Sequence, residues 1–247
     1  MTNDEHSEDA ARLDDGGRAG VMDAIEADPQ LRAILREVRQ GMEQDAAHDE
    51  AHLLRVARWT VRLGRDEGVD ERLAIAAALL HDVVNVPKTH PNRSRASELS
   101  ADVARDVLSS LGFDAADVED VAEAIRDHSF SRGAVPQTAL GRALQDADRL
   151  EALGALGTFR CIATGVRFGA DFFHADDPWA AHRPLEDGRY SVDHFFTKLL
   201  RLPPTLLTAA GRAEAERRAR AMVALLRQLS DELGEPLSDE HVAMLLH

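Results

Sequence analysis

A histidine and an aspartate stand side by side at the end of a strongly apolar segment. The segment ERLAIAAALL, residues 71–80, leads directly into His81 and Asp82. A helix that is apolar all round is expected to be buried, and burying two unsatisfied polar side chains costs on the order of several kcal/mol. A divalent cation would compensate the pair, because imidazole nitrogen and carboxylate oxygen are both good ligands. The alternative is that His81 caps the helix and Asp82 pairs with Arg55 or Arg58.

Three more histidines and two more aspartates are candidates for the same site. His48 and His52 lie four residues apart, and therefore on one face of a predicted helix. His128 ends another amphipathic helix, where a lone histidine is more often a satisfied helix-end residue. Asp146 and Asp148 lie about 200° apart around a regular helix, so they cannot both point at one ion. At most one of them is a ligand, and the other has a supporting or surface role.

The elements that position these residues are predicted to be helices. Apolar residues recur at helical spacing from about Val21 onward, and strand-like alternation is scarce. Asp70 suits a helix N-terminus, and the glycine in DEGVD ends the preceding helix. The predicted fold is a single all-α bundle, with helices over about residues 53–63, 71–80, 96–111 and 114–128, from about 138 through 154 and beyond, and from after Pro204 to about 230.

Two proline-containing segments are predicted to be loops. Residues 85–95, NVPKTHPNRSR, carry two prolines and several turn formers, and they are the most basic stretch before residue 140. Residues 169–188 form the second loop. Loops of this length within a compact domain are usually functional or disordered. The large apolar side chain of Trp179 favours an ordered excursion.

Composition limits the class of protein. Lysine and arginine number 29 against 44 aspartates and glutamates, a formal net charge of −15, which argues against binding of nucleic-acid polymers or anionic membranes. The single cysteine, Cys161, excludes an intrachain disulfide and suits a reducing compartment. No apolar stretch approaches the roughly 18 residues that span a bilayer, and no basic and apolar leader opens the chain. We therefore expect a cytoplasmic protein.

Four motifs follow one another in order along the chain: HLLRV, ALLHD, HSFS and DADRLEALG. This order resembles the HD-domain metal-dependent phosphohydrolases, whose signature is a histidine, an adjacent histidine–aspartate pair and a distant aspartate on separate helices of an all-α core. HDVVNVPKTHPNRSRAS, QDADRLEALGALG and HRPLEDGRYSVDHFFTKLL are similar to a bacterial subgroup of small stand-alone HD hydrolases. Some members of that subgroup cleave nucleoside triphosphates to the monophosphate and pyrophosphate. The resemblance covers about residues 30–230.

The resemblance implies a metal site with His52, His81, Asp82 and Asp148 as protein ligands. This mixed nitrogen and oxygen set suits Mn²⁺, Mg²⁺, Fe²⁺, Co²⁺ or Ni²⁺ without selecting among them. Asp146 is left for a supporting role. The candidates for orienting the attacking water or protonating the leaving oxygen are His128, His48 and Asp146, with histidine preferred because its pKa lies near neutrality.

Basic residues are expected to hold the phosphates of the substrate, because the acidic surface as a whole does not attract them. The candidates are Lys88, Arg95 and Arg149, and for Arg93 a solvated loop position is an equal alternative. A disordered acidic tail is expected over residues 1–19, the HD hydrolase domain over 20–235, and a C-terminal helical extension over 236–247.

Three functions are compatible with this sequence. The first is a metal-dependent pyrophosphohydrolase of nucleoside or deoxynucleoside triphosphates. The second is a nucleotide monophosphatase or a cyclic-nucleotide phosphodiesterase. The third, a non-catalytic metal- or nucleotide-binding module, is disfavoured because all four signature positions are retained. The expected partner is a small phosphorylated molecule, and a homo-oligomer is compatible with the sequence.

Overall fold

The computed structural model describes residues 18–41, 50–84, 95–129 and 132–246. Contacts between Cα atoms divide the chain into two compact units, Met1–Asp148 and Arg149–His247. Apart from an isolated β-bridge between Asp171 and Tyr190, the regular structure of the described residues is helical, and the predicted all-α class is confirmed. No helix among those residues combines the length and the hydropathy needed to cross a bilayer.

The first unit is built around one apolar helix. α5 (Glu71–Leu80) packs against five other helices of the described residues, and every residue from Ala74 to Leu80 is buried, as the sequence predicts. Asp70 caps its N-terminus by accepting hydrogen bonds from the backbone N–H groups of Arg72 and Leu73. The helices of this unit other than α5 are α2 (Arg18–Ala27), α3 (Pro29–Gly41), α4 (Glu50–Arg65), α6 (Ala96–Ser110), α7 (Ala115–Asp127) and most of α8 (Ala139–Leu150).

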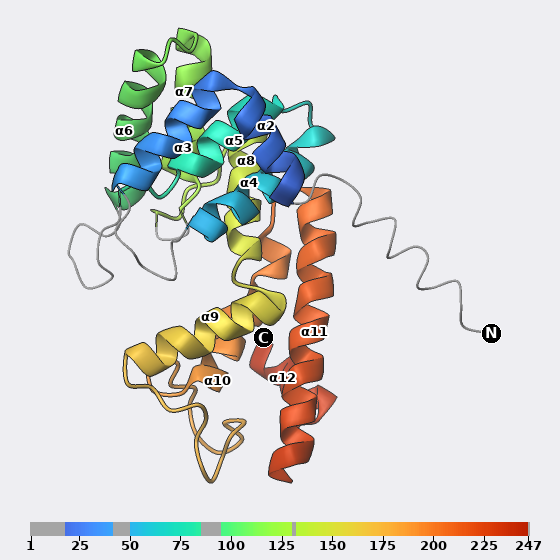
Figure 1. Ribbon diagram of the computed structural model, residues 1–247. Coiled ribbons are helices and arrows are strands. Elements are labelled where there is room, and N and C mark those ends of the chain that lie inside the picture. Colours follow the sequence, from blue (N-terminus) through green and yellow to red (C-terminus); the bar gives the residue numbers. More distant parts are fainter. Residues whose placement is uncertain (1–17, 42–49, 85–94, 130–131, 247) are drawn as a thin grey trace. The chain divides into compact units, whose positions relative to one another are not determined.

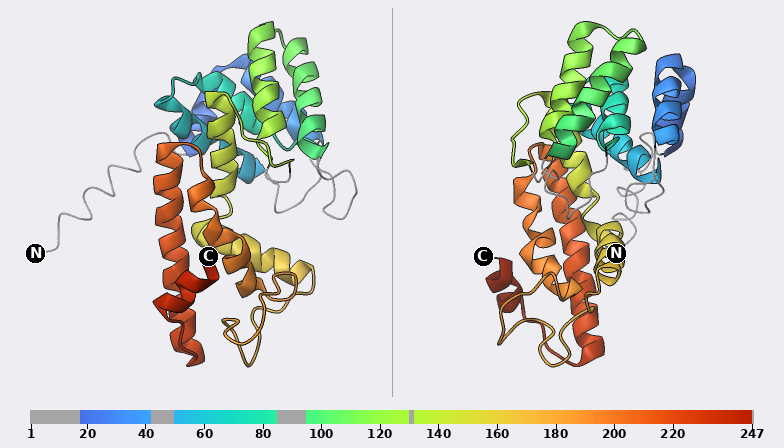
Figure 2. Two further views of the ribbon diagram at one scale, coloured as in Figure 1. Left: turned by 180° about the vertical axis from the view of Figure 1, so that it is seen from behind. Right: turned by 90° about the vertical axis from the view of Figure 1, so that its left-hand side faces the viewer.

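The neighbours of α5 come from both sides of it in the sequence. α2, α3 and α4 precede it, and α6 and α7 follow it. α6 and α7 lie side by side, in green in Figures 1 and 2. Because α5 is enclosed in this way, the residues directly after Leu80 emerge between helices that carry the other candidate residues.

The second unit contains α9 (Gly154–Arg167), α10 (Ser191–Thr197), α11 (Ala209–Leu233) and α12 (Asp239–Leu246). α9 and two short 3-10 helices, Leu199–Arg201 and Pro203–Thr205, pack against α11, and α10 packs against α12. Gly157 allows the turn before α9, since a Cβ atom there would lie 2.2 Å from the carbonyl group of Ala152.

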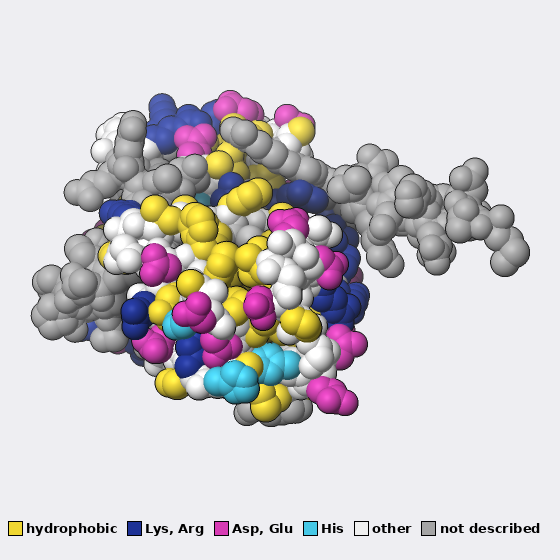
Figure 3. All heavy atoms as spheres, turned by 90° about the horizontal axis from the view of Figure 1, so that it is seen from below, with side chains coloured by type: hydrophobic (Ala, Val, Ile, Leu, Met, Phe, Trp, Pro, Cys, Tyr) yellow, Lys and Arg dark blue, Asp and Glu magenta, His cyan; other side chains and the backbone are white. Residues whose placement is uncertain are grey.

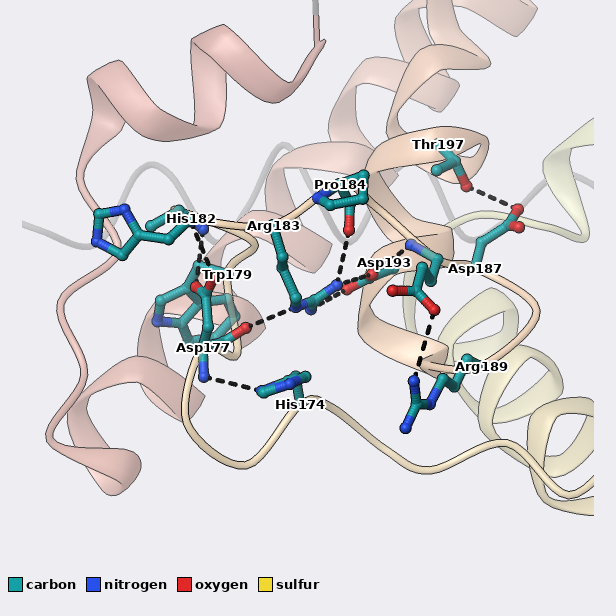
Figure 4. Close-up of polar contacts among 12 residues, drawn as sticks. His174, Asp177, Trp179, His182, Arg183, Pro184, Asp187, Arg189, Asp193 and Thr197 are labelled. Carbon is teal, nitrogen blue, oxygen red and sulfur yellow. Dashed lines mark hydrogen bonds and ion pairs between the residues drawn. The ribbon is translucent and has the colours of Figure 1, made fainter.

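The excursion between α9 and α10 is ordered by polar contacts, which Figure 4 shows. The carboxylate of Asp177 accepts hydrogen bonds from the backbone N–H groups of Ala181 and His182. The guanidinium group of Arg183 donates two hydrogen bonds to the carboxylate of Asp193, at 2.5 and 2.8 Å. Trp179 donates its indole N–H to the carbonyl of Glu235. The ordered excursion expected from Trp179 is therefore present.

Some large apolar side chains are exposed. Phe159 on α9 is 72% exposed, and Val166, Phe168 and Phe172 are each more than half exposed. Hydrophobic side chains are also interspersed with acidic and histidine side chains on the face that Figure 3 presents.

The predicted domain boundaries stay predictions. The acidic segment expected to be disordered lies outside the described residues, except for its last two positions, where α2 begins at Arg18. The compact units divide between Asp148 and Arg149, within α8.

Candidate metal centre

Three histidines and two aspartates come together in the first unit. They form two overlapping groups, within each of which the potential ligand atoms lie within 4.8 Å of one another. His81 belongs to both groups and therefore stands at the centre of the cluster. One group is His52, His81 and Asp148, and the other is His81, Asp82 and His128.

The residues of the cluster are placed by four different helices. His52 lies in the first turn of α4, and Asp148 lies near the end of α8. His81 and Asp82 follow directly on α5, and His128 follows directly on α7. Two of the positions are therefore helix C-caps, and the packing of α5 against α4 and α7 brings them together.

The distances within the cluster suit groups that share an ion. Nε2 of His52 lies 3.8 Å from the Asp148 carboxylate, and Nε2 of His81 lies 3.7 Å from that of Asp82. Nε2 of His128 lies 3.8 Å from the other oxygen of Asp82. These separations exceed hydrogen-bond length. Metal–ligand bonds of about 2.1 Å put neighbouring octahedral ligands about 3 Å apart and opposite ones about 4.2 Å apart, which brackets the observed values.

Backbone contacts fix the tautomer of two of the histidines. Nδ1 of His81 lies 2.8 Å from the carbonyl oxygen of Ala78, and Nδ1 of His128 lies 2.6 Å from that of Ile125. A carbonyl oxygen only accepts, so Nδ1 carries the proton in both rings. In the neutral ring, Nε2 then presents its lone pair to the cluster. A backbone carbonyl on the second ring nitrogen is the usual support of a metal-binding histidine.

The three imidazole rings are buried, whereas the two carboxylates reach solvent. His52, His81 and His128 are each at most 4% exposed, and the side chains of Asp82 and Asp148 are about 30% exposed. Within the described part of the chain, Nε2 of His81 is buried and makes no hydrogen bond. Burial, together with the nearby His81, lowers the pKa of His128. Buried imidazoles beside accessible carboxylates fit a divalent cation that is reached from solvent.

The helix-cap alternative for His81 and the metal-ligand hypothesis are compatible. His81 is the C-cap residue of α5, and its Nδ1 contacts the carbonyl of the last turn. The opposite side of the same ring faces Asp82, His52 and His128. The imidazole of His81 therefore contacts the end of α5 through Nδ1 and faces the cluster with Nε2.

The other predicted residues have different surroundings. Asp146 is fully buried and belongs to neither group among the described residues, as the 200° rotation along α8 requires. Arg95 is exposed and lies 3.5 Å from Glu98. Arg149, in the second unit, donates to the carbonyl oxygen of Thr205 at 2.6 Å. The predicted residues His48, Lys88 and Arg93 lie outside the described residues.

Sequence reasoning assigned His128 a catalytic role and left Gln145 unmentioned. The structure brings Nε2 of His128 as close to Asp82 as the nitrogen of His81 is. Gln145 is buried and donates to the backbone carbonyls of Asp127, at the end of α7, and of Ala134, shortly before α8. The only feature of the sequence that could have drawn attention to Gln145 is its position directly before Asp146. Its hydrogen bonds could not be predicted, because backbone carbonyl partners cannot be recognised from residue types.

Comparison with known proteins agrees with this geometry. The family model of the HD domain matches residues 50–153, which contain all five residues of the cluster. The uncharacterized protein YpgQ of Bacillus subtilis is 31% identical over 195 residues, which cover 77% of this chain and 87% of YpgQ.

Solved structures extend the likeness to the fold. The crystal structure of B. subtilis YpgQ in complex with ADP has a TM-score of 0.64 at 30% identity, covering 82% of this chain and 94% of that chain. An HD-superfamily hydrolase from Bacillus thuringiensis has a TM-score of 0.63 at 29% identity, covering 83% of this chain and 97% of that chain. The family match thus spans the positions of the cluster, the structural likeness covers most of the chain around them, and the chain belongs to the HD superfamily of metal-dependent hydrolases.

Proposed function

We propose that the protein is a phosphohydrolase that cleaves nucleoside or deoxynucleoside triphosphates to the monophosphate and pyrophosphate. The observation that carries the proposal is the convergence of three buried imidazoles and two accessible carboxylates in one cluster. The YpgQ structure contains ADP, which supports a nucleotide as the substrate class. The similarity of the later motifs to the pyrophosphohydrolase subgroup supports the triphosphate.

In the proposed site, His52, His81, Asp82 and Asp148 hold the divalent ion. Their donor atoms are imidazole nitrogens and carboxylate oxygens, a set that suits Mn²⁺, Mg²⁺, Fe²⁺, Co²⁺ or Ni²⁺. Such an ion polarises a phosphoryl oxygen and lowers the pKa of a bound water. The exposed side of Asp82 and Asp148 is the side from which the phosphates approach.

We assign His128 the role of orienting the attacking water. Because its Nδ1–H is committed to the carbonyl of Ile125, its free nitrogen, Nε2, is a hydrogen-bond acceptor. An acceptor beside Asp82 can hold a water by its proton and take that proton as the water attacks phosphorus. Asp146, buried two residues before Asp148, has a supporting role.

Arg95 is the described residue best suited to bind a phosphate. Its side chain is 61% exposed, and its contact with Glu98 is 3.5 Å long. Exposed pairs of this kind contribute about 0–1 kcal/mol, so a phosphate can replace Glu98 as the partner of the guanidinium group. We also assign phosphate binding to Lys88 and Arg149, and to His48 a role in assisting proton transfer.

Product analysis tests this function. Metal-stripped protein is supplied separately with Mn²⁺, Mg²⁺, Co²⁺ and Ni²⁺ and incubated with nucleoside tri-, di- and monophosphates and with cyclic nucleotides. Pyrophosphate and orthophosphate are measured separately. We expect equimolar monophosphate and pyrophosphate from triphosphates. Orthophosphate released fastest from monophosphates would refute the proposal in favour of a monophosphatase, and cleavage of the cyclic nucleotides alone would favour a phosphodiesterase.

A further inference from the structure

One buried side chain joins the two helices that carry opposite sides of the cluster. Gln145 lies on α8, three residues before Asp148, and is 1% exposed. Its Nε2 donates to the carbonyl oxygen of Asp127 at 3.1 Å and to that of Ala134 at 3.2 Å. Because both partners are acceptors, the amide nitrogen must face them.

The two carbonyls flank the segment that begins with His128. Asp127 is the last residue of α7, and its carbonyl is one of the helix-end groups that lack an intrahelical donor. Ala134 lies where the chain returns toward α8. The amide group of Gln145 therefore holds the carbonyls of Asp127 and Ala134 close to one another.

We propose that Gln145 is a positioning residue that sets the imidazole of His128 against Asp82. The peptide group between Asp127 and His128 is held by the helix that carries Asp148. The ring of His128 is held in turn by the carbonyl of Ile125, and its Nε2 lies 3.8 Å from Asp82. The amide of Gln145 thus helps to set the position of His128 relative to Asp148.

The chemistry of the amide explains why glutamine occupies this position. Methionine has nearly the same length and shape but no donor, so it would leave two carbonyls unsatisfied. Glutamate would place a carboxylate oxygen against two carbonyl oxygens. Leaving a buried acceptor without a donor is unfavourable, so we expect the end of α7 to shift in such variants.

The segment keeps other supports when the amide is removed. Arg132 pairs with Asp127, with its Nε 3.3 Å from the carboxylate, and also with Glu98. These ion pairs join the same segment to α6 and to the end of α7. We therefore expect a Gln145 variant to fold while the geometry at His128 relaxes.

Cobalt binding tests the inference, which rests on the metal centre of the proposed function. Co²⁺ is titrated into metal-free wild type, Gln145→Met and the matched control Gln137→Met, whose exposed amide donates to the carbonyl of Val135 at 2.7 Å. Dissociation constants and visible absorption spectra are recorded. We expect Gln145→Met to bind Co²⁺ about 10- to 100-fold more weakly and with a changed spectrum, because a displaced His128 no longer supports the ligand Asp82 beside it. Gln137→Met should match wild type.

A double variant shows whether the effect passes through His128. Gln145→Met should add little to the loss of affinity already caused by His128→Ala. If Gln145→Met lowers the melting temperature but leaves the cobalt affinity and spectrum unchanged, the positioning role is wrong. If Gln145→Met does not fold, Gln145→Asn, which keeps the amide but is too short to reach both carbonyls, replaces it with the same expectation. Absence of Co²⁺ binding in wild type would instead refute the metal centre itself, and the inference with it.

Discussion

The imidazole rings of His81 and His128 stand nearly perpendicular, at 82°, with their centroids 5.1 Å apart. Each follows directly on a helix, each contacts a carbonyl of the preceding turn through Nδ1, and each turns Nε2 toward Asp82. Two helix ends thus present the same nitrogen to one carboxylate. This repeated arrangement indicates that both histidines act at the cluster and are not only capping residues, His81 as a proposed ligand and His128 as the proposed acceptor for water.

The two aspartates of α8 should respond differently to removal of charge. Asp148→Asn should lose the metal, because an accessible carboxylate oxygen near His52 is removed. Asp146→Asn should keep most of the metal and lose turnover rate, as expected for a buried side chain outside both ligand groups. Elemental analysis and initial rates give the comparison. Loss of metal from Asp146→Asn alone would move the ligand assignment by two residues.

Removing the side chain of Lys88 or Arg95, the basic residues after Asp82, should weaken binding of the substrate and leave binding of the metal unchanged. We expect Lys88→Ala and Arg95→Ala to raise KM for a triphosphate about tenfold, by the loss of about 1.4 kcal/mol of phosphate binding each. Metal content should stay at the wild-type level. Steady-state kinetics with elemental analysis check this, and Arg189→Ala, an exposed arginine of the second unit, serves as the control. An unchanged KM in both variants would exclude these residues from phosphate binding.

The ion pair of Arg183 and Asp193 should be the costliest polar contact to break in the second unit. Asp193 is 1% exposed, and Arg183 is 11% exposed in its side chain. Hydrogen bonding to Asp193 raises the pKa of Arg183, so the arginine stays charged when its partner is removed. Asp193→Ala should lower the free energy of unfolding by about 3–5 kcal/mol, measured by urea denaturation. Glu186→Ala, which removes an exposed 3.7 Å pair with Arg189, should cost less than about 1 kcal/mol; equal losses would contradict the account.

Cys161 should react slowly in the folded protein. Burial raises the pKa of its thiol from 9.0 to about 11, so the thiolate fraction at pH 8 falls about 100-fold. Alkylation by iodoacetamide should be slower than in urea by at least that factor. Because the folded pKa is the higher one, the stability that this thiol contributes is present below pH 9 and is lost as the pH rises toward 11. Alkylation at equal rates in folded and unfolded protein would show that the thiol is not protected.

The sequence predicted the parts of the site that depend on local pattern. The apolar segment before His81 and the capping residue Asp70 define α5 without reference to any other helix, and both are present. The separation of Asp146 and Asp148 follows from helical geometry alone. The position of His128 beside Asp82 required the packing of α7 against α5, which no local pattern encodes. The contacts of Gln145 could not be predicted from the sequence for the same reason, because its partners are backbone carbonyls 18 and 11 residues away.

Metal content tests the central claim most directly. The experiment compares wild type with the single variants His52→Ala, His81→Ala, Asp82→Ala and Asp148→Ala. His182→Ala is the control, because the side chain of His182 is exposed and outside both groups. Each protein is stripped of metal, reloaded with Mn²⁺ and dialysed. Bound metal is then measured by elemental analysis, with circular dichroism to verify the fold. The account predicts stoichiometric metal in wild type and His182→Ala, and loss of metal from the four folded ligand variants. Stoichiometric metal retained by all four would contradict it.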